Sequence, residues 1–89
     1  MKEYMRLVGV TLNSDLNLAN ISLTGDLELI GVTVNGDLVL DLAKVGGSLV
    51  LVSCRVSGKL SLVGTEVIGE KRILDVQAKE YVTSYSFEN

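Results

Sequence analysis

Residues 32–40 read VTVNGDLVL, and two similar phrases lie close by, ISLTGDLEL at residues 21–29 and CRVSGKLSL at residues 54–62. Cutting the chain every eleven residues from Val10 gives six blocks, which fill residues 10–75 without an insertion or a deletion. An uninterrupted repeat is typical of solenoids, because one copy buries too little apolar surface alone and the copies must stack. The stretch VTVNGDLVL is therefore interpreted as part of one repeat of a solenoid.

Each block, with Val10 as position 1 of the first, has the pattern of two short strands. Positions 1 and 3 are mostly apolar or β-branched, as are positions 7 and 9, and this alternation predicts strands with one buried face. Position 5 is glycine in five blocks: Gly25, Gly36, Gly47, Gly58 and Gly69. We expect a corner at positions 4–6, because a left-handed or otherwise strained backbone suits Gly and is tolerated by Asn and Asp. Glycines at this spacing would break a helix.

The blocks predict an all-β fold, a right-handed β-solenoid (β-helix) with 22 residues per coil. Two blocks per coil provide four short sides and eight inward side chains, whereas an eleven-residue coil would be overpacked. Stacking at eleven residues would also place Asp15, Asp26 and Asp37 in one column about 4.8 Å apart. The 22-residue coil still places Asp15 over Asp37, so the smaller coil stays open. A β-sandwich is the other alternative, but it would not need this period.

The chain is expected to be one domain, 1–89, with about four coils. Residues 1–9 would form an N-terminal cap, residues 10–75 the repeats, and residues 76–89 a C-terminal cap or docking strand. All four aromatic residues lie outside the repeats: Tyr4, Tyr81, Tyr85 and Phe87. An open solenoid end must be covered or paired, so these residues are candidates either for capping or for an interface with another subunit.

Apolar residues at positions expected to face outward give a second candidate interface. At a spacing of 22 residues, Ile30, Val52 and Leu74 would stack into a ladder at position 10. Val39 and Val50, at position 8, should also face outward. Exposed apolar ladders often mark interfaces. The alternative is that position 10 turns inward and belongs to the core.

Charge changes sign along the chain. Residues 7–42 contain five acidic and no basic residues, whereas residues 43–72 contain five basic and two acidic ones. Since sequence position is height along a solenoid, one end should be acidic and the other basic. The functional interpretation is lateral or staggered association between unlike regions, and the alternative, which weighs somewhat more, is chance drift of the composition. The net charge of −3 has the wrong sign for general nucleic-acid binding, so no nucleic-acid partner is expected.

No combination of residues in the sequence predicts catalysis. The chain has no His, and its single Cys54 occupies an apolar position and is interpreted as a packing residue. The repeated Gly-Asp suggests a calcium-binding β-roll, but that motif has a nine-residue period, and position 6 changes to Ser48, Lys59 and Glu70. We therefore expect no enzyme activity, no cofactor and no metal, and Asp37 at the surface.

Apolar runs long enough for targeting or membrane insertion are not expected from this sequence. The N-terminus lacks a long apolar run, and no stretch of eighteen apolar residues occurs, so no signal peptide or transmembrane segment is expected. A cytoplasmic location is the expectation, and peripheral association with a membrane stays open.

The phrase V-x-G-D-L-x-L resembles the repeat of bactofilins, the polymer-forming β-helix proteins of bacterial cytoskeletons. The residues that carry this resemblance are Val34, Gly36, Asp37, Leu38 and Leu40, with their equivalents across residues 10–75. The resemblance implies a right-handed β-helix that stacks end to end into filaments without nucleotide, often at the membrane. The strict period and the short chain depart from that family. The coil size is also similar to that of pentapeptide-repeat proteins, which are four-sided solenoids.

Three hypotheses for the function follow. The first is a structural protein that self-assembles, with its own copies as partners and filaments as the product. The second is a scaffold, monomeric or dimeric, that binds another protein on one face. The third is a module of a longer chain without activity of its own.

Overall fold

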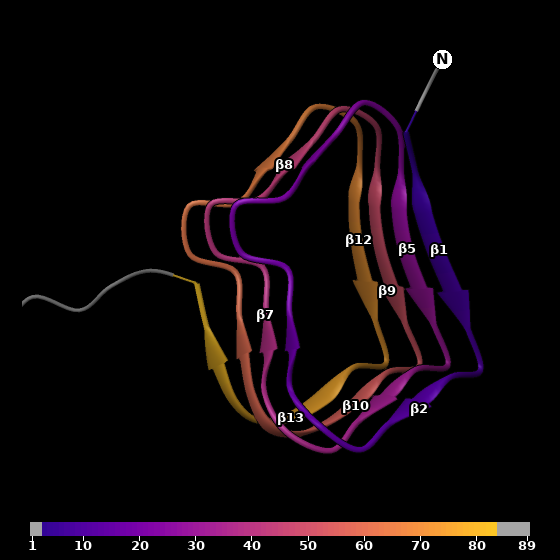
Figure 1. The fold of residues 1–89 in the computed structure, drawn as a ribbon, viewed down its shortest axis with the longest axis vertical. Helices are drawn as coiled ribbons and strands as arrows, with labels where there is room; N and C mark the ends of the chain where they lie inside the picture. The colour runs from indigo at the N-terminus through magenta and orange to yellow at the C-terminus, as the bar shows by residue number, and fades with distance from the viewer. Residues whose placement is uncertain (1–2, 84–89) are drawn as a thin grey trace, which may run out of the picture.

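The computed structural model describes residues 3–83, which form a β-solenoid of about four turns without a helix (Figure 1). All strand pairing in this part of the chain is parallel, and residues 22 apart are partners, for example Leu27 with Leu49 and Val34 with Val56. The fold class and the 22-residue coil are confirmed, and the eleven-residue coil is excluded.

The strands form three parallel sheets. The first sheet has the order β1 (Met5–Val8), β5 (Leu27–Ile30), β9 (Leu49–Val52) and β12 (Lys71–Leu74). The second has the order β2 (Thr11–Leu12), β6 (Thr33–Val34), β10 (Arg55–Ser61), β7 (Leu38–Val39) and β3 (Leu16–Asn17), with β13 (Gln77–Val82) also paired to β10. The third has the order β11 (Glu66–Val67), β8 (Lys44–Val45) and β4 (Ser22–Leu23).

The strand β10 explains why four expected sides become three sheets. It pairs with β6 at its start and with β7 near its end, so it runs through a corner that separates these two strands in the coil below. The two short sides that meet at this corner are therefore joined into one sheet. The four strand segments per coil that the alternation predicted are present on these three sheets.

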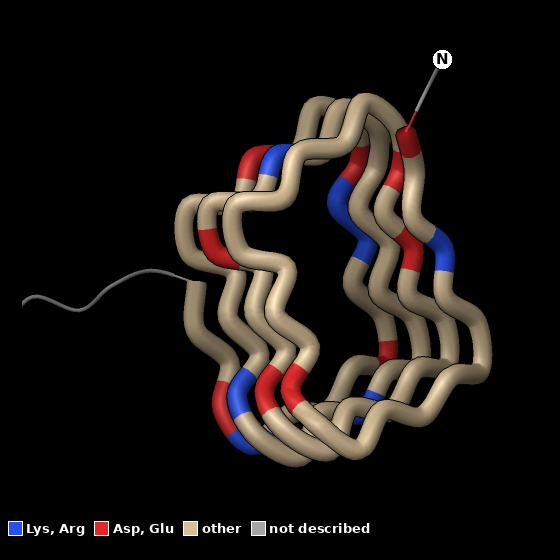
Figure 2. The backbone as a smooth tube through the Cα atoms, viewed as in Figure 1, with Lys and Arg blue, Asp and Glu red and all other residues tan. Residues whose placement is uncertain are grey.

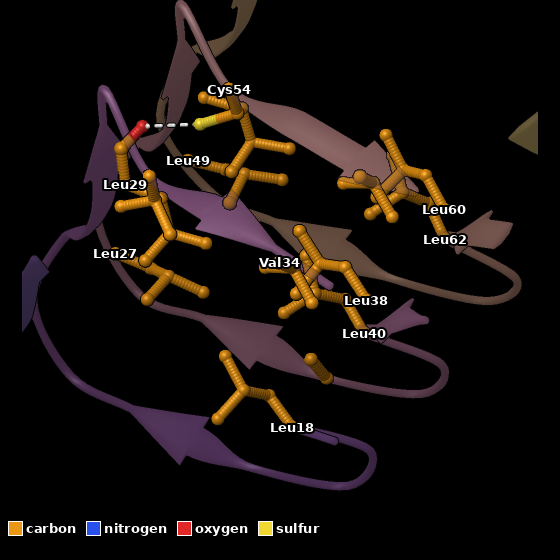
Figure 3. Close-up of a cluster of buried hydrophobic side chains, with 14 of the residues drawn as sticks. Leu18, Leu27, Leu29, Val34, Leu38, Leu40, Leu49, Cys54, Leu60 and Leu62 are labelled. Atoms are coloured by element: carbon orange, nitrogen blue, oxygen red, sulfur yellow. Dashed lines mark hydrogen bonds between the residues drawn. The ribbon is translucent and has the colours of Figure 1, made fainter. Parts of the chain in front are cut away.

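The core consists of the inward side chains of successive coils (Figure 3). The second coil contributes the eight predicted inward side chains, each at most 1% exposed: Leu27, Leu29, Val32, Val34, Leu38, Leu40, Ala43 and Val45. Cys54 is buried in the next coil, where its Sγ lies 3.1 Å from the carbonyl oxygen of Leu29. This position agrees with the prediction of a packing residue.

The left-handed residues lie at position 11 of the block, so a left-handed backbone at the corner of positions 4–6, one of the two predicted alternatives, is wrong. Positive φ angles recur every eleven residues: Gly9, Asn20, Gly31, Leu42, Ser53, Gly64 and Asp75. The glycines of position 5 are needed for a different reason, because there is no room for a side chain at these positions. A Cβ on Gly36 would overlap Oδ1 of Asp15 and lie 2.9 Å from the Asp15 backbone nitrogen.

The aspartates of position 6 connect successive coils. Asp15 Oδ1 accepts a hydrogen bond from the backbone N–H of Asp37, and Asp37 Oδ1 accepts one from Lys59, each at 2.8 Å. Asp26 accepts one from the N–H of Ser48 in the same way. Asp37 is half-buried, so its expected surface position is only partly correct. The Gly-Asp pair of the repeat thus connects each coil to the next one.

The last described turn is one residue shorter than the others. Val56 pairs with Ala78, 22 residues later, but Leu60 pairs with Tyr81, 21 residues later. The shift lies opposite Ser57 and Gly58. As a consequence, Tyr81 continues the inward column of Leu38 and Leu60.

Candidate interfaces at the ends and outer faces

The N-terminal end of the described solenoid is open. The strands β1, β2, β3 and β4 are the edge strands there, because each pairs on one side only. In this first coil Leu18 is buried, but six other inward side chains are only partly buried: Met5, Leu7, Leu12, Leu16, Ile21 and Leu23. Each of these positions is fully buried one coil further on, as Leu16 and Leu38 show. This end exposes unpaired backbone groups together with apolar side chains.

The C-terminal end of the described solenoid is also open but differs in charge. Its edge strands are β11, β12 and β13, and Val67, Ile73, Val76 and Ala78 are partly buried there. One inward column of the first sheet consists of Met5, Leu27, Leu49 and Lys71. Its last member, Lys71 in β12, is charged and exposed. An inward-facing charge on an edge strand opposes further strand pairing. The two ends are therefore chemically unequal.

The aromatic candidates do not form one cluster in the part of the chain that is described. Tyr4 is 69% exposed beside β1, in the first rung. Tyr81 is 50% exposed in β13, in the last rung, where partial burial raises the pKa of its phenol. Tyr85 and Phe87 lie outside the described residues.

The predicted ladder at position 10 faces outward on the first sheet. Register pairs Val8 with Ile30, Ile30 with Val52, and Val52 with Leu74, and we call these four residues the apolar ladder. Val8 is 56% and Leu74 55% exposed, and the two middle residues are half-buried. The alternative that position 10 turns inward is therefore wrong for this sheet. Sequence reasoning missed Val8, which a search at 22-residue spacing before Val10 would have found.

The two position-8 valines lie on different sheets. Val50 is two residues before Val52 in β9, so it shares the face of the apolar ladder. Val39 lies in β7, between Asn17 of β3 and the buried Ser61 of β10. The structure thus places Val50 on the same face as the apolar ladder and Val39 on a different sheet.

The charged residues are spread over the rungs (Figure 2). The register places Glu66 beside Lys44 and Glu28 beside Arg6. Within residues 3–83 the single ion pair joins Arg72 and Glu70 at 3.3 Å, between two largely exposed side chains. A surface pair of this kind contributes little to stability.

Two hollows lie on the outer faces of the described solenoid. Both are built from positions 2 and 4 of blocks that stack in successive coils, and their side chains flank the backbone of position 3. The first has a volume of about 400 Å³ and is lined by Thr33, Asn35, Arg55, Val56, Ser57, Gln77, Ala78 and Lys79. The second has a volume of about 370 Å³ and is lined by Ser22, Leu23, Thr24, Lys44, Val45, Gly46, Glu66 and Ile68. Sequence reasoning missed both hollows.

Residues 3–83 contain no cluster of three or more His, Cys, Asp or Glu side chains that could hold a metal ion. The same part of the chain contains no helix with the length and apolar character needed to cross a bilayer. In comparisons with known proteins, no family, no curated protein and no solved structure matches this chain.

Proposed function

We propose that this protein is a structural β-solenoid that self-assembles through the open ends of its coil. The observation that carries this proposal is the pair of open ends, where edge strands and half-buried core side chains are exposed together. The resemblance of the V-x-G-D-L-x-L phrase to bactofilins agrees with this function.

A second copy of the chain is the partner that such an end fits best. An edge strand presents a row of N–H and C=O groups, and another edge strand of the same spacing can pair with them. The core of about four turns is small, so covering an end adds a large fraction of new burial. Pairing of copies would thus bury both the unpaired backbone and the apolar side chains of the end.

The N-terminal end is the stronger contact of the two. Its inward side chains are all apolar, whereas the C-terminal end carries Lys71 at an inward position. If both copies use the same end, the pair is closed, and a filament requires contacts at both ends. The balance between dimers and filaments therefore depends on how strongly Lys71 opposes the second contact.

The test combines sedimentation velocity with negative-stain microscopy of the unmodified protein and two variants. Leu16→Lys places a charge at a half-buried inward position of the N-terminal edge and should shift the protein towards monomers. Lys71→Leu removes the charge at the other end and should give larger assemblies. The control Lys44→Leu changes an exposed lysine of β8, in the middle of the stack, and should leave the sedimentation coefficient unchanged.

An unmodified protein that stays a monodisperse monomer at millimolar concentration would contradict the proposal. So would assemblies that are unchanged by Leu16→Lys and Lys71→Leu alike. Circular dichroism and the melting midpoint of each variant show whether the fold is retained.

A second candidate function is a scaffold that binds another protein through the apolar ladder and Val50. The outward exposure of Val8 and Leu74 favours it, because contiguous apolar surface often marks an interface. Val52→Arg would interrupt the middle of this face. Association that is lost in Val52→Arg but kept in Leu16→Lys would assign the contact to this side of the solenoid.

A further inference from the structure

The two hollows differ in the charge of the residues that line them. We call the first hollow the Arg55–Lys79 groove, and its polar lining residues are Thr33, Asn35, Arg55, Ser57, Gln77 and Lys79. We call the second hollow the Lys44–Glu66 groove. Since both grooves come from positions 2 and 4 of the same repeat, each serves as an internal comparison for the other.

The charges of the two grooves are different. The Arg55–Lys79 groove contains a guanidinium and an ammonium group and no carboxylate. In the other groove, Lys44 is the register partner of Glu66, so a carboxylate lies beside the lysine. The Arg55–Lys79 groove therefore concentrates positive charge on a protein whose net charge is −3.

Among the described residues, most side-chain donors of the Arg55–Lys79 groove have no hydrogen-bond partner. Within residues 3–83, the side chains of Arg55 and Lys79 make no ion pair and no hydrogen bond. The same holds for the hydrogen-bonding groups of Thr33, Ser57 and Gln77 in this part of the chain. Asn35 is already engaged, because its Nδ2 donates to Oδ1 of Asn13 at 2.9 Å.

The position of Lys79 follows from the irregular last turn. The register between β10 and β13 shifts between Val56 and Lys59, and this shift lies next to Lys79. A β-bulge bends the strand locally and changes the direction of the side chains at the irregularity. The irregularity thus lies at one wall of the groove, on the side of the ammonium group.

We propose that the Arg55–Lys79 groove binds the oxyanion group, a carboxylate or a phosphate, of a small molecule. A guanidinium offers two parallel N–H donors to such a group, and a lysine adds a point charge. Hydroxyl and amide donors at Thr33, Ser57 and Gln77 complete the set. The groove has a volume of about 400 Å³ and is open to solvent, so it has room for the oxyanion group while the rest of the small molecule stays exposed. The groove reaches β13, an edge strand of the C-terminal end, but binding in it does not require self-assembly.

Titration of the ¹⁵N-labelled protein with pyrophosphate and, separately, with citrate tests the proposal at constant ionic strength. Saturable shifts of the backbone amides of Arg55, Ser57, Gln77 and Lys79 are expected with at least one probe. The probe that binds more tightly identifies the preferred oxyanion. Arg55→Gln should weaken this binding by at least about tenfold, since hydrogen bonds to charged groups contribute substantially.

Two further variants make the test specific. Lys44→Gln removes the lysine of the other groove and should leave the affinity unchanged, because that lysine already has Glu66 beside it. Arg55→Lys keeps the positive charge but loses the planar guanidinium with its two parallel donors. Its affinity for the probe should therefore lie between that of the unmodified protein and that of Arg55→Gln. The spectrum of each free variant shows that it is folded.

Three results would overturn the proposal. The first is the absence of saturable shifts with both probes. The second is amide shifts that are as large at Lys44, Lys59 and Arg72, which lie outside the groove, as at the groove residues. Such shifts would indicate general screening of positive charges. The third is an affinity that Arg55→Gln leaves unchanged.

Discussion

At position 5 and position 6 of the repeat, glycine and aspartate depend on each other. The carboxylate of Asp15 extends under Gly36 of the next coil and accepts the N–H of Asp37. A side chain at Gly36 would occupy the place of this carboxylate. The pair is therefore required by the contact between coils, and this explains why the two residues recur together in the phrase VTVNGDLVL.

The first prediction concerns the Asp37 hydrogen bond. Asp37→Ala should lower the free energy of unfolding by about 1 kcal/mol, because the N–H of Lys59 loses its acceptor. Asp37→Asn should keep most of the stability, since its amide oxygen can accept the same bond. Urea unfolding measures both variants. Equal losses in the two would show that charge, and not the hydrogen bond, is what stabilises this corner.

The second prediction concerns backbone strain at Leu42. This residue has a φ of 60° and is 53% exposed, at a position that Asn20 occupies in the preceding coil. A left-handed conformation costs a branched residue about 1 kcal/mol, and Asn tolerates it better. Leu42→Asn should therefore raise the free energy of unfolding by up to about 1 kcal/mol. Leu42→Ala is the matched control, since it keeps the Cβ and should bring no gain.

At the scale of the strands, the two ends of the stack differ through single positions. Lys71 occupies in β12 an inward position that is apolar in β1, β5 and β9. Tyr81 occupies in β13 an inward position that is leucine in β3, β7 and β10. Both substitutions lie on edge strands, where the inward column has no further coil above it among the described residues.

The third prediction is a pH dependence that comes from Tyr81 in β13. Burial raises the pKa of its phenol above the ordinary 10.0, because the folded environment disfavours the charged form. This contribution to stability is fully present below pH 10.0 and is lost as the pH rises through the folded pKa. Tyr81→Phe should make the free energy of unfolding less dependent on pH above this value. An identical alkaline profile in the variant would show that Tyr81 does not couple to folding.

At the scale of the whole molecule, stability depends on the number of stacked rungs. In a solenoid each rung contacts only its neighbours, so the middle rungs are supported on both sides and the end rungs on one. The buried leucines lie mainly in the middle coils, and the inward residues of the ends are half-buried. The fold is thus weakest where the proposed assembly contacts lie.

The fourth prediction follows for hydrogen exchange. Amide protection should be highest in β5, β9 and β10 and lowest in the edge strands β1 and β12. At concentrations that produce assembly, the edge strands of the contacting end should gain protection while the middle strands stay unchanged. Uniform protection along the stack at low concentration would contradict the dependence of each coil on the support of its neighbours.

Much of the architecture was predicted from the sequence alone. The eleven-residue period and the alternation within each block predicted the strands, the inward columns and the 22-residue coil. The same register predicted that Ile30, Val52 and Leu74 would stack. These features are predictable because they depend on local patterns, namely the two-residue alternation of a strand and the regular spacing of the repeats.

Other features were decided only by the packing of one coil on the next. Among residues 3–83, five of the seven left-handed residues at position 11 are Gly, Asn or Asp, but Leu42 and Ser53 have types that give no signal of this conformation. The joining of two sides through β10 and the irregular last turn depend on how neighbouring rungs fit. The Arg55–Lys79 groove combines residues from three successive coils, so its charge and shape exist only in the stack. The sequence by itself thus determined the unit and its period, whereas the contacts between units, which are long-range, determined the corners, the unequal ends and the groove.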